Sequence, residues 1–379
     1  MTRLHDELAR IADHTPDVDL TETVLRRARR RRATALSAAS ALAVTLILAI
    51  SATVIGAPGP GEGGQAATSA QEVLPASGVA PLAYAYYDWC GEPPTDGLMA
   101  RTAGRDCLQW RVVTRSGDDY RVPEAMSVNI RGLTGSYVLV PAPVAITGDG
   151  RKIAYYSEQH ERFAVRDLES GQVRLAPPTM PVADIVEHGA EITLSDDGRF
   201  LALGAPRAVG TLVDVETGER TTVPASWSVR SIGAGGRAVV TENPDHLGLF
   251  ADGGVRPFTG AAWHTPGRSS PDGATIAHLT RPAGDENPTP GDYELITRDA
   301  ATGEVRTTTR FKDAPADFLP MRLGPWLSAT EITVAVNLPP GEPVPGWRTY
   351  AADVTTGAIR PLDTYSVSAP LGGVVLPGF

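Results

Sequence analysis

The chain has 379 residues and a formal net charge of −10 at pH 7, long enough for one large domain with attached segments. The charge is uneven: residues 1–32 carry eight Arg and six acidic residues, whereas residues 33–379 carry 26 basic and 38 acidic residues, a net of −12. Nucleic-acid affinity depends largely on neutralising phosphates, so this acidic balance argues against DNA or RNA as a partner of the larger part.

Residues 1–32 predict a short cytoplasmic segment of one or two helices. Leu4, Leu8 and Ile11 recur at helical spacing, and a second apolar run follows the break at residues 16–19. The segment is too small to bury a core of its own. We expect it to bind a partner, to lie against a membrane, or to serve only as a solvated tail that sets topology.

Residues 33–57 contain no charged side chain, and these 25 residues predict one transmembrane helix. At about 1.5 Å per residue the run exceeds the roughly 30 Å hydrocarbon core of a bilayer. Six Arg within residues 26–32 lie directly before it, which predicts a cytoplasmic amino terminus and an extracytoplasmic domain at the cell membrane. A cleaved signal peptide is the alternative, but the run is long for one and Pro58 follows the best cleavage site.

Cys90 and Cys107 are the only cysteines, and both fall on the predicted outer side. Thiols are usually oxidised there, so we expect a disulfide that closes an 18-residue loop. The loop-entropy model gives such a bond about 3 kcal/mol. Two buried free thiols or half of a metal site are the alternatives, and the lack of a nearby His makes zinc a poor fit.

Residues 58–79 are rich in Gly, Ala, Pro and Ser and predict a flexible linker. Residues 80–379 show short apolar runs between Gly-rich turns, without a convincing amphipathic helix, so we expect an all-β domain there.

A two-part phrase recurs in this domain: an Asp-Gly turn that enters an apolar strand, then an Asp-x-x-Thr-Gly-like turn about twenty residues later. Clear copies begin at Gly148, Asp196 and Pro271, and weaker copies begin at Gly235 and Ser328. Repetition at this period indicates one supersecondary unit copied and stacked. Each unit has room for four strands, as in one blade of a β-propeller.

A sixth unit is predicted upstream, at residues 82–122, so the best count is six blades. Seven would result if residues 364–375 paired back with the start of the domain. The turn acids are interpreted as structural, because Gly accepts a positive φ and Asp can bond nearby backbone amides.

Residues 194–202 and 270–277 resemble the repeat signature of TolB-like, WD-repeat-like propellers. That resemblance implies a binding platform and says little about activity. The amino-terminal layout is similar to that of actinobacterial membrane proteins, some of which accompany extracytoplasmic-function sigma factors. The zinc-binding type of that family needs a cytoplasmic His and two Cys, and here that side has His5 and His14 but no Cys.

Three tryptophans, Trp227, Trp263 and Trp326, each lie a few residues before the first turn of a blade. We expect them near the inner strands, where loops of several blades converge on a concave ligand site. His264 and Arg322 would supply polar groups to that site. The alternative is that these large aromatic side chains pack between neighbouring blades.

The sequence contains no nucleophile elbow, phosphate-binding loop, zinc-protease helix or dinucleotide fingerprint, so we expect no enzyme, cofactor or metal site. The best hypothesis is a single-pass membrane protein whose non-catalytic outer propeller binds a protein, peptide or cell-envelope ligand. One alternative is a transmembrane signalling protein whose cytoplasmic segment binds a regulator such as a sigma factor. An envelope hydrolase is the third.

Overall fold

The computed structural model describes residues 72–89, 108–133, 136–188, 190–204, 210–242, 246–258, 264–280, 289, 292–338, 346–366 and 374–379. The predicted cytoplasmic segment, the predicted membrane span and both cysteines lie outside these residues. Within them, no helix has the length and apolar character needed to cross a membrane.

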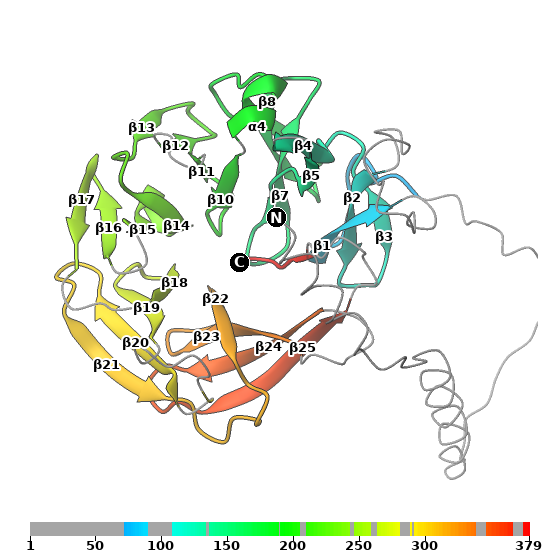
Figure 1. The fold of residues 1–379 in the computed structure, drawn as a ribbon. Helices are drawn as coiled ribbons and strands as arrows, with labels where there is room; N and C mark the ends of the chain where they lie inside the picture. The colour runs from blue at the N-terminus through cyan, green and yellow to red at the C-terminus, as the bar shows by residue number, and fades with distance from the viewer. Residues whose placement is uncertain are drawn as a thin grey trace, which may run out of the picture. The chain divides into compact units, whose positions relative to one another are not determined.

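Six four-stranded sheets follow one another around a ring, which makes the described domain a six-bladed, all-β propeller (Figure 1). Blades 1 and 2 consist of β26 (Val374–Val375), β1 (Leu82–Trp89), β2 (Leu108–Thr114) and β3 (Asp119–Arg121), then β6 (Val144–Ile146), β7 (Lys152–Ser157), β8 (Arg162–Asp167) and β9 (Val173–Leu175). Blades 3 and 4 consist of β10 (Glu191–Leu194), β11 (Phe200–Gly204), β12 (Thr211–Asp214) and β13 (Arg220–Thr222), then β14 (Ser228–Ile232), β15 (Ala238–Thr241), β16 (Leu247–Ala251) and β17 (Gly254–Pro257). Blades 5 and 6 consist of β18 (His264–Ser269), β19 (Thr275–Thr280), β20 (Glu294–Asp299) and β21 (Val305–Arg310), then β22 (Pro320–Trp326), β23 (Glu331–Asn337), β24 (Gly346–Asp353) and β25 (Ile359–Ser366).

The carboxy-terminal strand closes the ring as part of blade 1. Val375 pairs with Ala85 and Val374 with Tyr86, so β26 becomes the innermost strand beside β1. Residues 364–366 belong to β25, the outer strand of blade 6. The seven-blade alternative is therefore wrong, because the returning strand completes the first blade and adds no further one.

Two elements outside the blades were not predicted. The hairpin of β4 (Val128–Leu133) and β5 (Ser136–Pro141) lies between blades 1 and 2, and the short helix α4 (Val182–His188) lies between blades 2 and 3. The helix contacts β4, and its Ile185 is fully buried in the apolar cluster of blades 2 and 3. Seven residues are too few for a helical apolar period to show in the sequence.

The repeated Asp-Gly turns join the first and second strands of their blades through one shared set of hydrogen bonds. In blade 3, Ser195 Oγ donates to Asp197 Oδ1 at 2.5 Å, and the same oxygen accepts from Arg199 N at 3.0 Å. Gly198 then adopts a φ of +69°. Thr147 with Asp149 in blade 2, and Ser270 with Asp272 in blade 5, repeat these bonds. The acidic residues of these turns therefore have a structural role.

The second repeated turn joins the third and fourth strands. In blade 6, Asp353 Oδ1 accepts from the backbone nitrogens of Thr355 at 2.9 Å and Thr356 at 2.7 Å. The Thr355 hydroxyl also donates to this oxygen. That bond first, and the two backbone bonds after it, lower the pKa of Asp353 to about 2. Gly357 has a φ of +75°, and a Cβ there would collide with the carbonyl oxygen of Arg310 in blade 5.

Apolar side chains of the described residues form five buried clusters, and each cluster joins one pair of successive blades, from 1–2 through 5–6. Among the described residues, no such cluster contains side chains of both blade 6 and blade 1. Across that seam, the rings of Tyr84 and Tyr365 meet edge to face with centroids 5.7 Å apart. The ring is therefore closed differently here than at its other five joints.

Residues 72–79 belong to the packed domain, although the sequence assigned them to the linker. Leu74 and Val79 are buried in the cluster of blades 1 and 2. Val73 forms a parallel bridge with Arg121, beside the outer strand β3. The sequence missed this start because single apolar residues among Pro, Ala and Ser show no strand period.

Replacing Gly357 with Ala is expected to destabilise the propeller more than replacing Gly273 with Ala. Both glycines have positive φ, at +75° and +68°, but a Cβ at Gly273 meets nothing within 4 Å. The common backbone strain is about 1–2 kcal/mol, and the collision with Arg310 adds to it at Gly357 only. Urea denaturation of both variants measures the difference, and equal losses would contradict the close approach between blades.

The Asp353→Asn variant is expected to lose stability in a pH-dependent way. The carboxyl has a pKa of about 2 in the folded chain and roughly 3.9 when unfolded. Its contribution is therefore present above about pH 4 and is lost as the pH falls toward 2. Denaturation of both proteins between pH 7 and 2.5 should show the stability gap narrowing as pH falls, whereas a constant gap would refute the assigned bonds.

Candidate functional site

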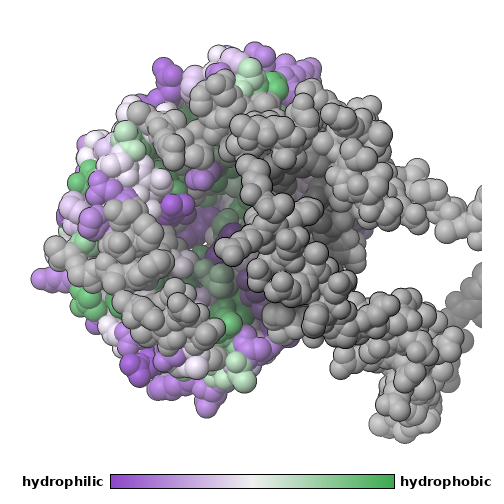
Figure 2. Space-filling view, viewed as in Figure 1, coloured by the Kyte–Doolittle hydropathy of each residue, from purple (hydrophilic) through white to green (hydrophobic). Residues whose placement is uncertain are grey.

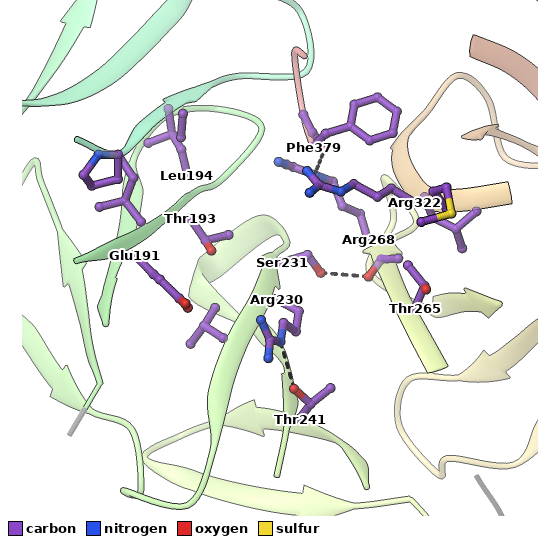
Figure 3. A pocket seen from close by; sticks show the side chains of 18 of the residues that line it. Glu191, Thr193, Leu194, Arg230, Ser231, Thr241, Thr265, Arg268, Arg322 and Phe379 are labelled. Atoms are coloured by element: carbon purple, nitrogen blue, oxygen red, sulfur yellow. Dashed lines mark hydrogen bonds between the residues drawn. The ribbon is translucent and has the colours of Figure 1, made fainter. Parts of the chain in front are cut away.

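A cavity of about 700 Å³ lies in the middle of the ring. The inner strands β6, β10, β14, β18 and β22 contribute to its wall, together with the last two residues of the chain. Figure 2 shows hydrophilic and hydrophobic residues around the central hollow. The polar and charged side chains that line it are Glu191, Thr193, Arg230, Ser231, Thr241, Thr265, Arg268 and Arg322 (Figure 3).

In the described part, three inner strands carry one or two residues more than the strands they pair with, and one such irregularity in each strand lies at the cavity. Val229 and Ser231 pair with the consecutive residues Val240 and Val239, which leaves Arg230 as the extra residue of β14. β18 and β22 show similar shifts around Arg268 and Met321. Bulges often re-aim side chains next to functional sites, and here each affects a residue that lines the cavity.

Arg268 is the most buried charged group of the cavity wall, with 6% of its side chain exposed. Its Nε donates to the carbonyl oxygen of Gly378 at 2.8 Å, and its Nη1 donates to Asp196 Oδ1 at 2.5 Å. Its own carbonyl oxygen accepts from Trp326 Nε1 at 2.7 Å. One residue of blade 5 thus connects a turn of blade 3, a strand of blade 6 and the carboxy-terminal segment.

The Arg268–Asp196 pair is an ion pair within the cavity wall. Burial lowers the pKa of Arg268, although Asp196 opposes that shift. Burial also raises the pKa of Asp196, with Arg268 acting in the opposite direction, and 48% of the Asp196 side chain remains exposed. A guanidinium stays protonated in proteins, so at neutral pH the two members of the pair offset each other's charge.

Arg230 and Arg322 have no acidic partner among the residues that the structure describes. Arg230 Nε donates to Thr241 Oγ1 at 2.9 Å (Figure 3). The guanidinium of Arg322 lies over the ring of Trp347, 5.4 Å from its centroid. Each arginine is therefore oriented by a neighbour that leaves further N–H groups unused.

The five residues that the sequence predicted for the ligand site do not all lie at the cavity. Arg322 lines the cavity. Trp227 packs in the cluster of blades 3 and 4, with its ring against Gly248. Trp326 packs in the cluster of blades 5 and 6. The structure thus gives these two tryptophans the packing contacts expected under the alternative. Trp263 and the side chain of His264 lie outside the described part.

Sequence reasoning missed the polar side chains of β10 and β14 that line the cavity. Glu191 and Thr193 lie two residues apart, so they emerge on one face of β10. The usable signal was their place in the entry strand, immediately before the Asp-Gly turn. The tryptophans did not indicate these polar residues, because Trp227 and Trp326 pack between strands.

No protein-family model matches the chain, and no curated protein does. Among solved structures, the hydrazine synthase of Kuenenia stuttgartiensis is similar, with 17% sequence identity and a TM-score of 0.40 over 61% of this chain and 69% of that chain. A likeness this distant supports no argument about family or activity.

Replacing Trp326 with Phe is expected to cost about 1 kcal/mol of folding free energy, because the Arg268 carbonyl loses its donor. Trp347→Phe is the matched control, since no hydrogen bond of its indole occurs among the described residues, and it should cost little. Denaturation in urea compares the two. Equal losses in both variants would contradict the role of the Trp326 bond.

Proposed function

We propose that this chain is a non-catalytic binding protein whose ligand occupies the central cavity. The observation that carries the proposal is the convergence of five inner strands on one hollow of about 700 Å³. Small-molecule sites commonly have volumes of roughly 300–1,000 Å³ and a few placed polar groups. Hydroxyl groups from blades 3, 4 and 5 provide such groups here.

The wall chemistry supports binding over catalysis. Ser231 Oγ donates to the carbonyl oxygen of Gly267 at 2.9 Å, so its proton is engaged by the main chain. The described residues of the wall include no His or Cys, and no hydrogen bond among them joins Ser231 to the carboxylate of Glu191. An activated hydroxyl needs such a base within hydrogen-bond reach.

The cellular setting in this proposal comes from the sequence alone. Residues 33–57 would anchor the protein in the membrane, with the Arg-rich segment inside and the propeller outside. Protease treatment of intact spheroplasts should then remove the propeller and spare a tag at the amino terminus. A propeller that stays protected until the cells are lysed would contradict this topology.

Binding in the cavity can be tested with Thr193→Trp, which places a large side chain in the wall. Thr222→Trp on the outer strand β13 is the control. Thermal-shift titration of the full chain with short peptides, sugars and small carboxylates would find stabilising compounds. We expect their affinity to fall more than tenfold in Thr193→Trp, a loss above about 1.4 kcal/mol, and to be unchanged in the control. Equal binding by both variants would place the ligand elsewhere.

A further inference from the structure

Among the described side chains that line the central cavity, arginines outnumber acidic residues, whereas acidic residues outnumber basic ones in the domain around it. Residues 33–379 carry a net charge of −12. Among the described residues, the charged side chains of the cavity wall are three Arg and one Glu. Because Asp196 neutralises Arg268, the free balance is Arg230 and Arg322 against Glu191. Two arginine side chains that have no acidic partner among the described residues are a feature that the fold itself does not require.

The two arginines come from different sides of the cavity. Arg230 belongs to β14 of blade 4, and Arg322 belongs to β22 of blade 6. Ser231 and Thr265 line the same cavity (Figure 3). A ligand that touches both guanidinium groups would therefore also lie beside these polar side chains.

Each of the two guanidinium groups has one described contact that orients it, and both arginines are exposed. Thr241 fixes Arg230 through Nε, which leaves the two terminal nitrogens as donors. Trp347 stacks on Arg322 and leaves the edge of its guanidinium plane free to donate. The edge of a guanidinium matches the paired oxygens of a carboxylate or phosphate. Holding it in advance reduces the entropy lost on binding.

We infer that the central cavity binds a small anionic molecule through Arg230 and Arg322. The inference rests on the proposed function and names the ligand class, a carboxylate or phosphate compound. Glu191, on the β10 side of the same wall, disfavours a further anionic group there and suits a hydroxyl or ammonium donor of the ligand.

Isothermal titration of the purified full chain with citrate, inorganic pyrophosphate and neutral trehalose tests this inference. We expect at least one of the two anions to bind, with the tighter one showing whether carboxylate or phosphate is preferred. Arg230→Gln and Arg322→Gln should each weaken that binding by about tenfold to a hundredfold, the size of a charge-assisted hydrogen bond. Arg220→Gln on the outer strand β13 removes the same charge and should change affinity less than about twofold.

The outcomes separate the inference from the proposed function. If neither anion binds, or if both glutamine variants bind as well as Arg220→Gln, the anion site is wrong. If trehalose then binds the unchanged protein but not Thr193→Trp, the cavity would still be a binding site, but for a neutral class of ligand. If the anions bind Thr193→Trp unchanged, the cavity assignment itself fails, and the inference fails with it.

Discussion

The buried guanidinium of Arg268 is the interaction on which the rest of this structure depends. The guanidinium donates hydrogen bonds to Asp196 of blade 3 and to the main chain at Gly378. The backbone carbonyl of Arg268 accepts a hydrogen bond from Trp326 of blade 6. A buried charge is costly unless its partners are in place. Segments more than 70 residues apart in the sequence must therefore meet before Arg268 is satisfied, and they meet only when the ring is closed.

The carboxy-terminal segment, which Arg268 contacts at Gly378, lies where the apolar core gives least help. Successive blades share apolar clusters except across the seam between blades 6 and 1, as far as the described residues show. Near this seam, the carboxy-terminal segment makes the contacts that connect the blades. Gly378 donates to Ile146 O at 2.9 Å, and the ring of Phe379 lies so close to Gly324 that no Cβ would fit. Gly378 and Phe379 also form part of the cavity wall, so ring closure and the shape of the site have the same origin.

The sequence predicted the repeated part of the fold because its turns need particular residues at fixed spacing. Asp197, Gly198 and Asp353 each make contacts that few other residue types can make, and the apolar strands beside them complete the pattern. Six blades followed from this, whereas the role of β26 did not. Two residues pairing across the whole length of the domain leave no local signal.

The candidate site was harder to predict for a physical reason. Its inner strands contain extra residues, and a bulge at Arg230 shifts the two-residue period that identifies a buried face. The sequence suggested Arg322 as a polar group of a ligand site, and Arg322 lines the cavity, but Arg230, Glu191 and Thr193 carry no motif of their own. Trp227 and Trp326 carried the stronger signal, and the structure gives both of them packing contacts between strands.

Native-state hydrogen exchange of the full chain tests most directly whether the carboxy-terminal segment closes the ring at the joint between blades 6 and 1. The account predicts that the amides of Val374, Val375 and Gly378 exchange through a sub-global opening, at a lower free energy than those of Ala202 and Val240 in blades 3 and 4. Equal protection of all five amides, lost only on global unfolding, would contradict it.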